Sequence, residues 1–329
     1  MDVMVSLPMQ AFIRDLRQGS RQSIRDCVQG LEDLGYWGVI VVDHILRSDT
    51  DVAEHHDEEH FNWRFPDPLS TLGYLAAITT TVRVGTRILV VPYRSPIATA
   101  HAVATVDSLS GGRVVLGVAP GYDASEFVKL GVPRTKRGRL TDEYLDVMRT
   151  LWAADGPVDF DGPTVSFQSA ELQLGPVQRP GPPLWVGGNT QVALERAVRV
   201  GDGWTPSIFA YHWPSATDGV HLTRDQLPGM LEWAGQRRAE AGLAPLTCVP
   251  SSGVPLKFTD SPQHPGRADS DIQQFSAIGT VEEQLREFQL FHQAGCSKFV
   301  IRLLGADTDD FLAQAEVFAK QIMPFIEQG

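Results

Sequence analysis

Several residue types and patterns that mark common protein classes are scarce in this chain of 329 residues. It has three cysteines, Cys27, Cys248 and Cys296, which lie far apart and show no C-x-x-C spacing. Their odd number argues against a disulfide framework and favours reduced thiols in a cytosol. No apolar run is long enough for a signal peptide or a membrane span. We therefore expect a cytoplasmic protein without a membrane partner.

Positive charge is scarce as well. Lys and Arg total 28 against 40 Asp and Glu, which gives a formal net charge of −12 and a pI near 5.2. Nucleic acids and anionic membranes attract clustered Lys and Arg, so we expect no nucleic-acid partner. Hydrophobic residues make up 43% of the chain, which is ample for a substantial core.

The motifs of several catalytic classes are missing. We find no G-x-S-x-G elbow, Walker loop or H-E-x-x-H pair, so nucleophilic, phosphoryl-transfer and zincin chemistry have little support. His55, His56 and His60 lie among carboxylates in one polar loop, whereas metal sites in barrels draw their ligands from several strand ends. We predict no metal site, and a divalent-metal hydrolase remains a distant alternative.

Short apolar runs alternate with longer amphipathic segments over most of the chain. This alternation predicts parallel β/α units rather than an antiparallel sheet. The candidate strands are Val3–Leu7, Gly38–Val42, Val82–Val90, Val114–Val118, Pro183–Val186, Gly203–Thr205, a weaker Val249–Leu256, and Lys298–Leu303.

About eight strands with as many helices fit an α/β fold of the (β/α)8 TIM-barrel type, and the length allows for insertions. We expect one domain over residues 1–329, with insertions near residues 48–65, 157–182, 207–229 and 250–276. The alternating stretch Val158–Phe167 around Asp161-Gly162 predicts a short hairpin. An open doubly wound sheet is the alternative, but its glycine-rich turn is absent after the first strand.

Polar residues follow the second predicted strand, where a barrel places its catalytic groups. Asp43 and His44 come directly after the run Gly38–Val42. Because imidazole titrates near neutral pH, His44 is a candidate for proton transfer, the alternative being a hydrogen-bonded residue of the barrel rim. Trp63 and Phe65, in the next loop, are candidates for the wall of a substrate pocket or for an ordinary packed loop.

A turn after the fifth predicted strand has the features of an anion site. Gly187, Gly188, Asn189 and Thr190 separate a short apolar run from a helical pattern. Glycines allow a close approach to the backbone, and the first N–H groups of a helix attract negative charge. The turn therefore predicts a bound anion.

Five stretches in order resemble the bacterial luciferase-like monooxygenase superfamily, most closely its coenzyme F420-dependent oxidoreductase branch. They cover roughly residues 36 to 206, and the last third of the chain is similar only through Ala294–Leu304. The stretches are VVDH (Val41–His44), VRVGTRILVVPYRSP (Val82–Pro96), VDSLSGGRVVLGVAPGYDASEFVKLGVP (Val106–Pro133), RGRLTDEYLDVMRTLW (Arg137–Trp152) and PVQRPGPPLWVGGNTQVALERAVRVGDGWTP (Pro176–Pro206).

This resemblance implies a barrel that holds a flavin or deazaflavin at the carboxyl ends of its strands, and a homodimer. The anion would be the cofactor phosphate, a non-prolyl cis peptide near Arg87-Ile88 would press on the ring, and His44 would face the substrate. The cofactor-binding residues it implies are Asp43, Arg87, Ile88, Val90, Ala119, Gly121, Gly187, Gly188, Asn189 and Thr190.

Two positions bear on the cofactor and the substrate. Pro120 stands where many FMN-using relatives carry a phosphate-binding arginine, which favours F420 over FMN. Tyr122 stands where sugar-phosphate dehydrogenases carry an acidic Glu, so that substrate class is not expected, and Tyr122 joins His44 as a candidate catalytic residue.

We therefore predict an F420-dependent oxidoreductase that transfers a hydride between the deazaflavin and a small organic C=C, C=N, C=O or alcohol substrate. The alternatives are an FMNH2-dependent monooxygenase and a non-catalytic flavin- or deazaflavin-binding protein on the same fold.

Overall fold

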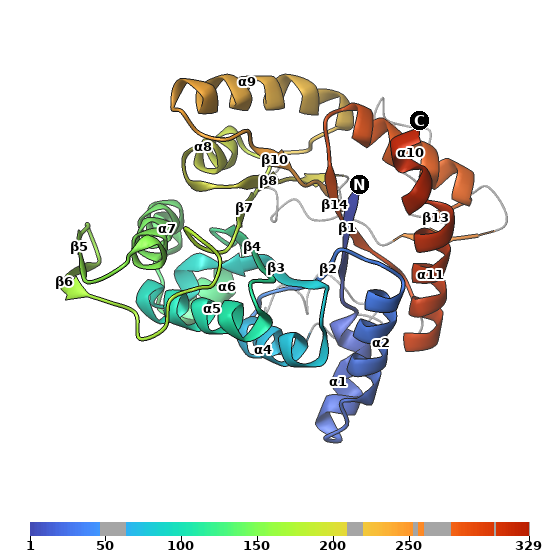
Figure 1. The fold of residues 1–329 in the computed structure, drawn as a ribbon, viewed down its shortest axis with the longest axis horizontal. Coiled ribbons are helices and arrows are strands. Elements are labelled where there is room, and N and C mark those ends of the chain that lie inside the picture. The colour runs from blue at the N-terminus through green and yellow to red at the C-terminus, as the bar shows by residue number, and fades with distance from the viewer. Residues whose placement is uncertain (47–63, 209–219, 253–255, 260–277, 306, 329) are drawn as a thin grey trace. The chain divides into compact units, whose positions relative to one another are not determined.

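Short buried strands alternate with helices in the computed structural model of the chain, which is of the α/β type (Figure 1). The structure describes residues 1–329 except 47–63, 209–219, 253–255, 260–277, 306 and 329. The described chain divides into two units, Met1–Ile40 with Val186–Gly329 (unit 1) and Val41–Trp185 (unit 2). The prediction of a single domain over residues 1–329 stays a prediction.

Unit 1 brings the two ends of the chain together in one parallel sheet. Strand β1 (Asp2–Ser6) pairs with β2 (Gly38–Val41) on one side and with β14 (Lys298–Arg302) on the other. The short strands β11 (Ser251–Ser252) and β9 (Ser207–Ile208) continue this sheet, and β8 (Gly203–Thr205) pairs with β10 (Thr247–Cys248). Lys257–Phe258 (β12) and Ile278–Gly279 (β13) form a separate parallel pair.

The helices of unit 1 cover this sheet with apolar faces. They are α1 (Met9–Arg17), α2 (Gln22–Asp33), α8 (Gln191–Val200), α9 (Leu227–Glu240), α10 (Val281–Gln293) and α11 (Thr308–Gln321), with short 3-10 turns at Arg224–Gln226 and Met323–Gln328. Phe288 of α10 contacts Phe299 of β14 and Phe318 of α11 edge-on, at 4.9 and 5.0 Å between ring centroids. Such aromatic pairs stabilise the core beyond the area they bury.

Unit 2 is built around the parallel pair β3 (Arg83–Val90) and β4 (Val114–Ala119). Its helices are α4 (Pro68–Ile78), α5 (Pro96–Ser110), α6 (Ala124–Lys129) and α7 (Arg137–Ala153), with 3-10 turns at Val91–Tyr93 and Arg134–Lys136. The indole of buried Trp152 on α7 donates a hydrogen bond to the carbonyl of Ala100 on α5 at 2.9 Å. Strand β7 (Leu184–Gly187) crosses the boundary between the units.

The hairpin predicted at Val158–Phe167 is present. Strands β5 (Val158–Asp161) and β6 (Ser166–Ala170) pair antiparallel, and Phe160 stacks near Phe167 with 5.7 Å between ring centroids. The carboxylate of Glu143 on α7 accepts hydrogen bonds from the backbone N–H groups of Thr164 and Val165, which fastens the hairpin to the helix.

The weak strand predicted near Val249–Leu256 is present in part. Ser251 and Ser252 form β11, residues 253–255 lie outside the described residues, and Val249 and Pro250 separate β11 from β10, since Pro250 has no N–H with which to continue a ladder. Part of the predicted insertion at residues 207–229 is also regular structure, since β9 begins it and α9 starts at Leu227. Within the described residues, no helix is both long enough and apolar enough to span a bilayer.

Candidate active site

Asp43 lies two residues after the end of β2, and its side chain is held by an arginine and a backbone amide. Arg94 donates to both carboxylate oxygens, at 2.6 Å from Nη1 to Oδ2 and at 2.9 Å from Nη2 to Oδ1. The N–H of Val90, at the end of β3, donates to Oδ2 at 2.9 Å. Arg94 also donates to Asp67, the N-cap residue of α4, at 3.1 Å. Asp43 is 2% exposed, so this charge is buried only because it is paired.

His44, the next residue, takes a different carboxylate as its partner. Its Nδ1 lies 2.8 Å from Oε2 of Glu126, which is 82 positions further along the chain. On the other side of the ring, Nε2 lies 3.5 Å from the hydroxyl oxygen of Tyr122. The rings of Phe65 and Tyr122 contact the imidazole, with centroids 5.6 and 5.9 Å away. The side chain of His44 is 24% exposed, so it is partly accessible from outside.

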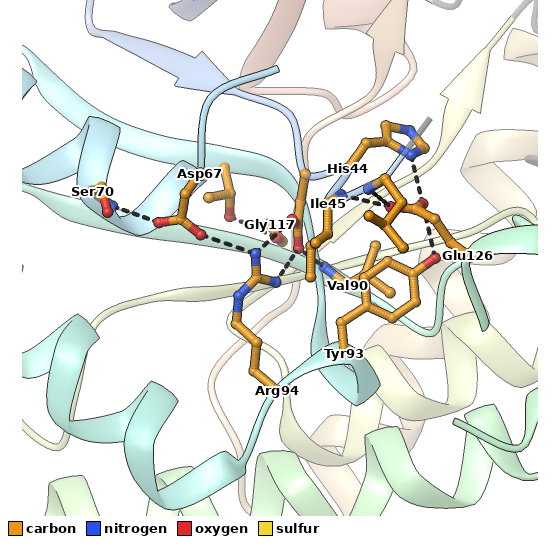
Figure 2. Close-up of polar contacts among 12 residues, drawn as sticks. His44, Ile45, Asp67, Ser70, Val90, Tyr93, Arg94, Gly117 and Glu126 are labelled. Atoms are coloured by element: carbon orange, nitrogen blue, oxygen red, sulfur yellow. Dashed lines mark hydrogen bonds and ion pairs between the residues drawn. The ribbon is translucent and has the colours of Figure 1, made fainter. Parts of the chain in front are cut away.

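Glu126 is fully buried and accepts hydrogen bonds from four groups. Its Oε1 accepts from the N–H groups of Ile45 at 2.6 Å and Leu46 at 2.9 Å. Its Oε2 accepts from the hydroxyl of Tyr93 at 3.1 Å and faces His44. Figure 2 shows these contacts converging on the one carboxylate. The residue is fixed in the first turn of α6, which Asp123 caps by accepting from the N–H groups of Ser125 and Glu126.

The ion pair changes the proton affinity of both partners. Burial alone lowers the pKa of His44, but the hydrogen bond and charge of Glu126, with smaller contributions from Asp43 and Asp123, raise it above its ordinary value of 6.5. Burial alone raises the pKa of Glu126, but the hydrogen bond from His44 and the N–H groups of Leu46 and Ile45 bring it below its ordinary value of 4.5. Around neutral pH the carboxylate is therefore ionised, and the imidazole holds its proton more firmly than a free histidine does.

Strand β3 is irregular just before Val90. The peptide bond between Arg87 and Ile88 is cis, at the position that the resemblance implies, and the pairing of β3 with β4 shifts between Thr86 and Leu89. Gly117 of β4 faces this irregularity, because a Cβ atom there would lie 2.3 Å from the carbonyl oxygen of Thr86. The absence of a side chain at residue 117 thus lets the two strands approach each other.

The predicted anion turn lies in unit 1. Gly188 has a φ of +126°, a conformation that residues with side chains rarely adopt, and the Thr190 hydroxyl caps α8 by accepting from the N–H of Ala193. The side chain of Asn189 bonds the backbone of Ser207 and Val220 and so fixes the turn. The buried hydroxyl of Thr205, at the end of β8, has no hydrogen-bond partner among the described residues.

The structure groups many of the predicted site residues in unit 2. Asp43 bonds Val90, His44 contacts Tyr122 and Phe65, and Gly121 has a positive φ of +80° beside Val90. Arg87 and Ile88 form the cis peptide, and Ala119 ends β4. Trp63 and the histidines at residues 55, 56 and 60 lie outside the described residues.

Sequence reasoning missed Glu126, Tyr93 and Arg94. Asp123 and Glu126 have the spacing of a capping box, which is a local signal with a local interpretation. In the structure Glu126 turns away from that role and bonds residues 44 to 46 instead. Its partners come from a distant part of the chain, so no local pattern could have indicated them.

One group of side chains has the composition of a metal site. Potential ligand atoms of His44, Asp123 and Glu126 all lie within 4.8 Å of one another. However, one oxygen of each carboxylate already accepts hydrogen bonds from backbone N–H groups, and the other oxygen of Glu126 is bonded to Tyr93 and His44, so a metal ion would compete with those donors. We interpret the group as a hydrogen-bond network.

Comparison with known proteins places these features in context. The sequence profile of the luciferase-like monooxygenases matches residues 1–222. An uncharacterized protein of Mycobacterium tuberculosis is 36% identical over 138 residues, which are 42% of this chain and 49% of that protein, so the chain spans about half of that relative. An FMNH(2)-dependent dimethylsulfone monooxygenase of Pseudomonas putida is 33% identical over 131 residues, 39% of this chain and 36% of that protein.

Among solved structures, an F420-dependent secondary alcohol dehydrogenase in complex with an F420-acetone adduct superposes with a TM-score of 0.75. The two chains are 18% identical, and the superposition covers 99% of each. At this identity the likeness shows the fold alone, and it confirms the α/β barrel class predicted from the sequence.

Proposed function

The chain belongs to the luciferase-like monooxygenase family, and from this premise we propose that it is an F420-dependent oxidoreductase. It transfers a hydride between the deazaflavin and a small organic substrate with a C=C, C=N or C=O bond, or an alcohol in reverse. One observation carries the proposal. Asp43, bonded to the N–H of Val90 just past the irregular part of β3, precedes a partly exposed histidine whose Nδ1 is held by Glu126 and whose Nε2 lies 3.5 Å from the hydroxyl of Tyr122.

Each unit, taken by itself, has groups that suit a part of such a cofactor. In unit 1, the glycine turn and the first N–H groups of α8 suit a phosphate, and the buried hydroxyl of Thr205 can bond a ligand. In unit 2, Asp43 presents a fixed negative charge for a polar edge of the ring. Exposed Arg134 and Lys136 offer positive charge for the carboxylates of an F420 tail.

When bound, F420 supplies a carbon that gives or accepts a hydride, and the chain has to manage the proton. His44 gains or loses it at Nε2, because Nδ1 is engaged with Glu126. Tyr122 lies 3.5 Å from Nε2 and orients the substrate or passes the proton on. For reduction of a C=C or C=O bond, His44 would give its Nε2 proton to the substrate atom next to the carbon that receives the hydride, which balances the electron pair left there.

A second candidate is an FMNH2-dependent monooxygenase. It is favoured by the 33% identity to the dimethylsulfone monooxygenase, whereas Pro120 in place of an arginine favours F420. We also propose a homodimer in the cytoplasm, and the dimer can be tested by light scattering of the purified protein.

The experiment separates the two chemistries. Purified protein is mixed without oxygen with reduced F420 and a panel of enones, imines and ketones, and separately with reduced FMN in air. We expect oxidation of reduced F420 that depends on an organic substrate, and a fall of about 10²- to 10⁴-fold in His44→Gln. Substrate-dependent oxygen uptake with FMN, and no turnover with F420, would contradict the proposal.

Glu143→Gln is the matched control. Glu143 on α7 also accepts hydrogen bonds from two backbone N–H groups, but these belong to Thr164 and Val165 of the hairpin. This variant should therefore keep wild-type turnover.

A further inference from the structure

The other three donors to Glu126 determine which ring nitrogen of His44 carries a proton. Two backbone N–H groups and the Tyr93 hydroxyl donate to the carboxylate, which has no proton to give. The 2.8 Å contact with His44 therefore requires a proton on Nδ1. In neutral His44 the remaining lone pair must then lie on Nε2, the nitrogen nearest Tyr122.

The carboxylate of Glu126 is held in one orientation, which a simple surface ion pair would not require. Glu126 is fully buried, and both of its oxygens are engaged, so it cannot rotate without leaving N–H groups unbonded. The same carboxylate holds the backbone of Ile45 and Leu46, the residues just after His44. It therefore fixes both the imidazole ring and the chain that carries it.

We propose that Glu126 is the positioning residue of the site: it locks His44 in the Nδ1–H form and leaves Nε2 as the atom that exchanges a proton with the substrate. The role of Nε2 rests on the proposed function, but the locked tautomer does not. Tyr93 supports the carboxylate from the opposite side, and its ring packs edge-on against Phe127 with 5.0 Å between centroids.

The groups that face His44 define what a test can measure. They are the carboxylates of Glu126, Asp43 and Asp123, the hydroxyl of Tyr122 and the ring of Phe65. Asp43 is already neutralised by Arg94, and Asp123 caps α6, so among the described residues Glu126 is the charged group in direct contact with His44. Removing its charge should therefore change the tautomer and the pKa of His44 more than removing the charge of Asp43 or Asp123.

The test uses nitrogen NMR of protein labelled with ¹⁵N-histidine, with the His44 signals identified by their loss in His44→Gln. In wild-type protein we expect neutral His44 to carry its proton on Nδ1. In Glu126→Gln, the amide oxygen can still accept from Ile45 and Leu46, so the amide N–H₂ turns to His44. Nδ1 then becomes the acceptor, the proton moves to Nε2, and the pKa of His44 falls because the charge of Glu126 is gone.

Two controls separate charge and tautomer from packing. Glu143→Gln makes the same chemical change on α7 and should leave both the tautomer and the pKa of His44 as in wild type. Tyr93→Phe removes one donor but keeps the carboxylate, so the proton should stay on Nδ1. Wild-type behaviour of His44 in Glu126→Gln would overturn the proposal, and so would a reversed tautomer in Tyr93→Phe. Glu126→Asp should restore the wild-type tautomer in part.

Kinetics then test the link to catalysis. With a substrate from the reduced-F420 screen, Glu126→Gln should lower kcat with little change in KM and shift the pH profile to lower pH. If the NMR result holds but no cofactor supports turnover, the proposed function fails and the positioning role stands. A wild-type pH profile in an active Glu126→Gln enzyme would overturn the catalytic part of the inference.

Discussion

At the scale of single residues, two neighbouring positions are paired in opposite ways. Asp43 is a negative group whose charge is met by the guanidinium of Arg94, and His44 is a basic group whose charge is met by Glu126. Burial lowers the pKa of Arg94, but its hydrogen bonds and attraction to Asp43 and Asp67 raise it above the ordinary value. Asp43 thus serves as a fixed negative charge, while His44 keeps a proton that can exchange.

The shifted pKa values predict how stability depends on pH. A raised pKa at His44 stabilises the fold below the unfolded value of 6.5, and this contribution is lost as the pH rises through the folded pKa. A lowered pKa at Glu126 stabilises the fold above 4.5, and this contribution is lost as the pH falls through the folded pKa. Both contributions to stability are therefore fully present between pH 4.5 and pH 6.5.

We therefore expect His44→Gln to cost more stability near pH 6 than near pH 9. Each unit of pKa shift corresponds to about 1.4 kcal/mol of the difference. Urea unfolding of wild-type and variant protein at the two pH values measures it, with Glu143→Gln as the reference for unrelated effects of pH. An equal cost at both pH values would show that the ion pair does not contribute in this way.

At the scale of elements, the contact between β3 and β4 determines where Asp43 and Val90 meet. The pairing shift between Thr86 and Leu89 changes the course of β3, and Thr86 donates from its hydroxyl to the carbonyl of Gly117 at 2.8 Å. Val90 is the last residue of β3, just after this shift, and its N–H donates a hydrogen bond to the carboxylate of Asp43. The contact between β3 and β4 at Gly117 thus helps to fix the position of the Val90 N–H that bonds Asp43.

Gly117→Ala should disrupt this contact. The added Cβ would lie 2.3 Å from the carbonyl oxygen of Thr86, so one strand has to move, and we expect a loss of about 1–3 kcal/mol or more. Gly73→Ala is the matched control, because Gly73 lies inside α4 with no atom within 4 Å of the new Cβ. That change should be neutral or stabilising by up to about 1 kcal/mol. Equal unfolding free energies for the two variants would contradict this explanation of Gly117.

Much of the element order could be predicted from the sequence. The strand predicted at Gly203–Thr205 coincides with β8, and the runs around Gly38 and Val114 agree with β2 and β4 within one residue. These strands are short buried apolar runs bounded by turn residues, a local signal. The strand predicted near Val249–Leu256 begins only at Ser251, and composition does not predict this start, because pairing partners and Pro250 decide it.

The site could be predicted only in part. Asp43 and His44 follow a clear strand, and family resemblance located the Arg87-Ile88 peptide. The pairing of His44 with Glu126 joins residues 82 positions apart, and that of Asp43 with Arg94 joins residues 51 apart. Contacts of this kind depend on how strands and helices come together, which periodicity does not contain.

At the scale of the whole molecule, the central claim concerns a ligand. The chain carries a formal net charge of −12, so an anionic cofactor needs local donors that overcome the general repulsion. Fixed backbone N–H groups at α8 and basic residues near the start of α7 are such donors. A ligand that binds only the folded chain also stabilises it, by about 2.7 kcal/mol at a concentration about 100 times its Kd.

The most direct test is a titration of the purified protein with F420 and, separately, with FMN, followed by the fluorescence of its seven tryptophans. We predict binding of F420 with a Kd of about 1 µM or lower, which corresponds to about 8 kcal/mol, and much weaker binding of FMN. Tighter binding of FMN would contradict the choice of F420 and favour oxygen-dependent chemistry. Binding of neither would contradict the central claim, since the glycine turn and the His44 site would then serve another ligand.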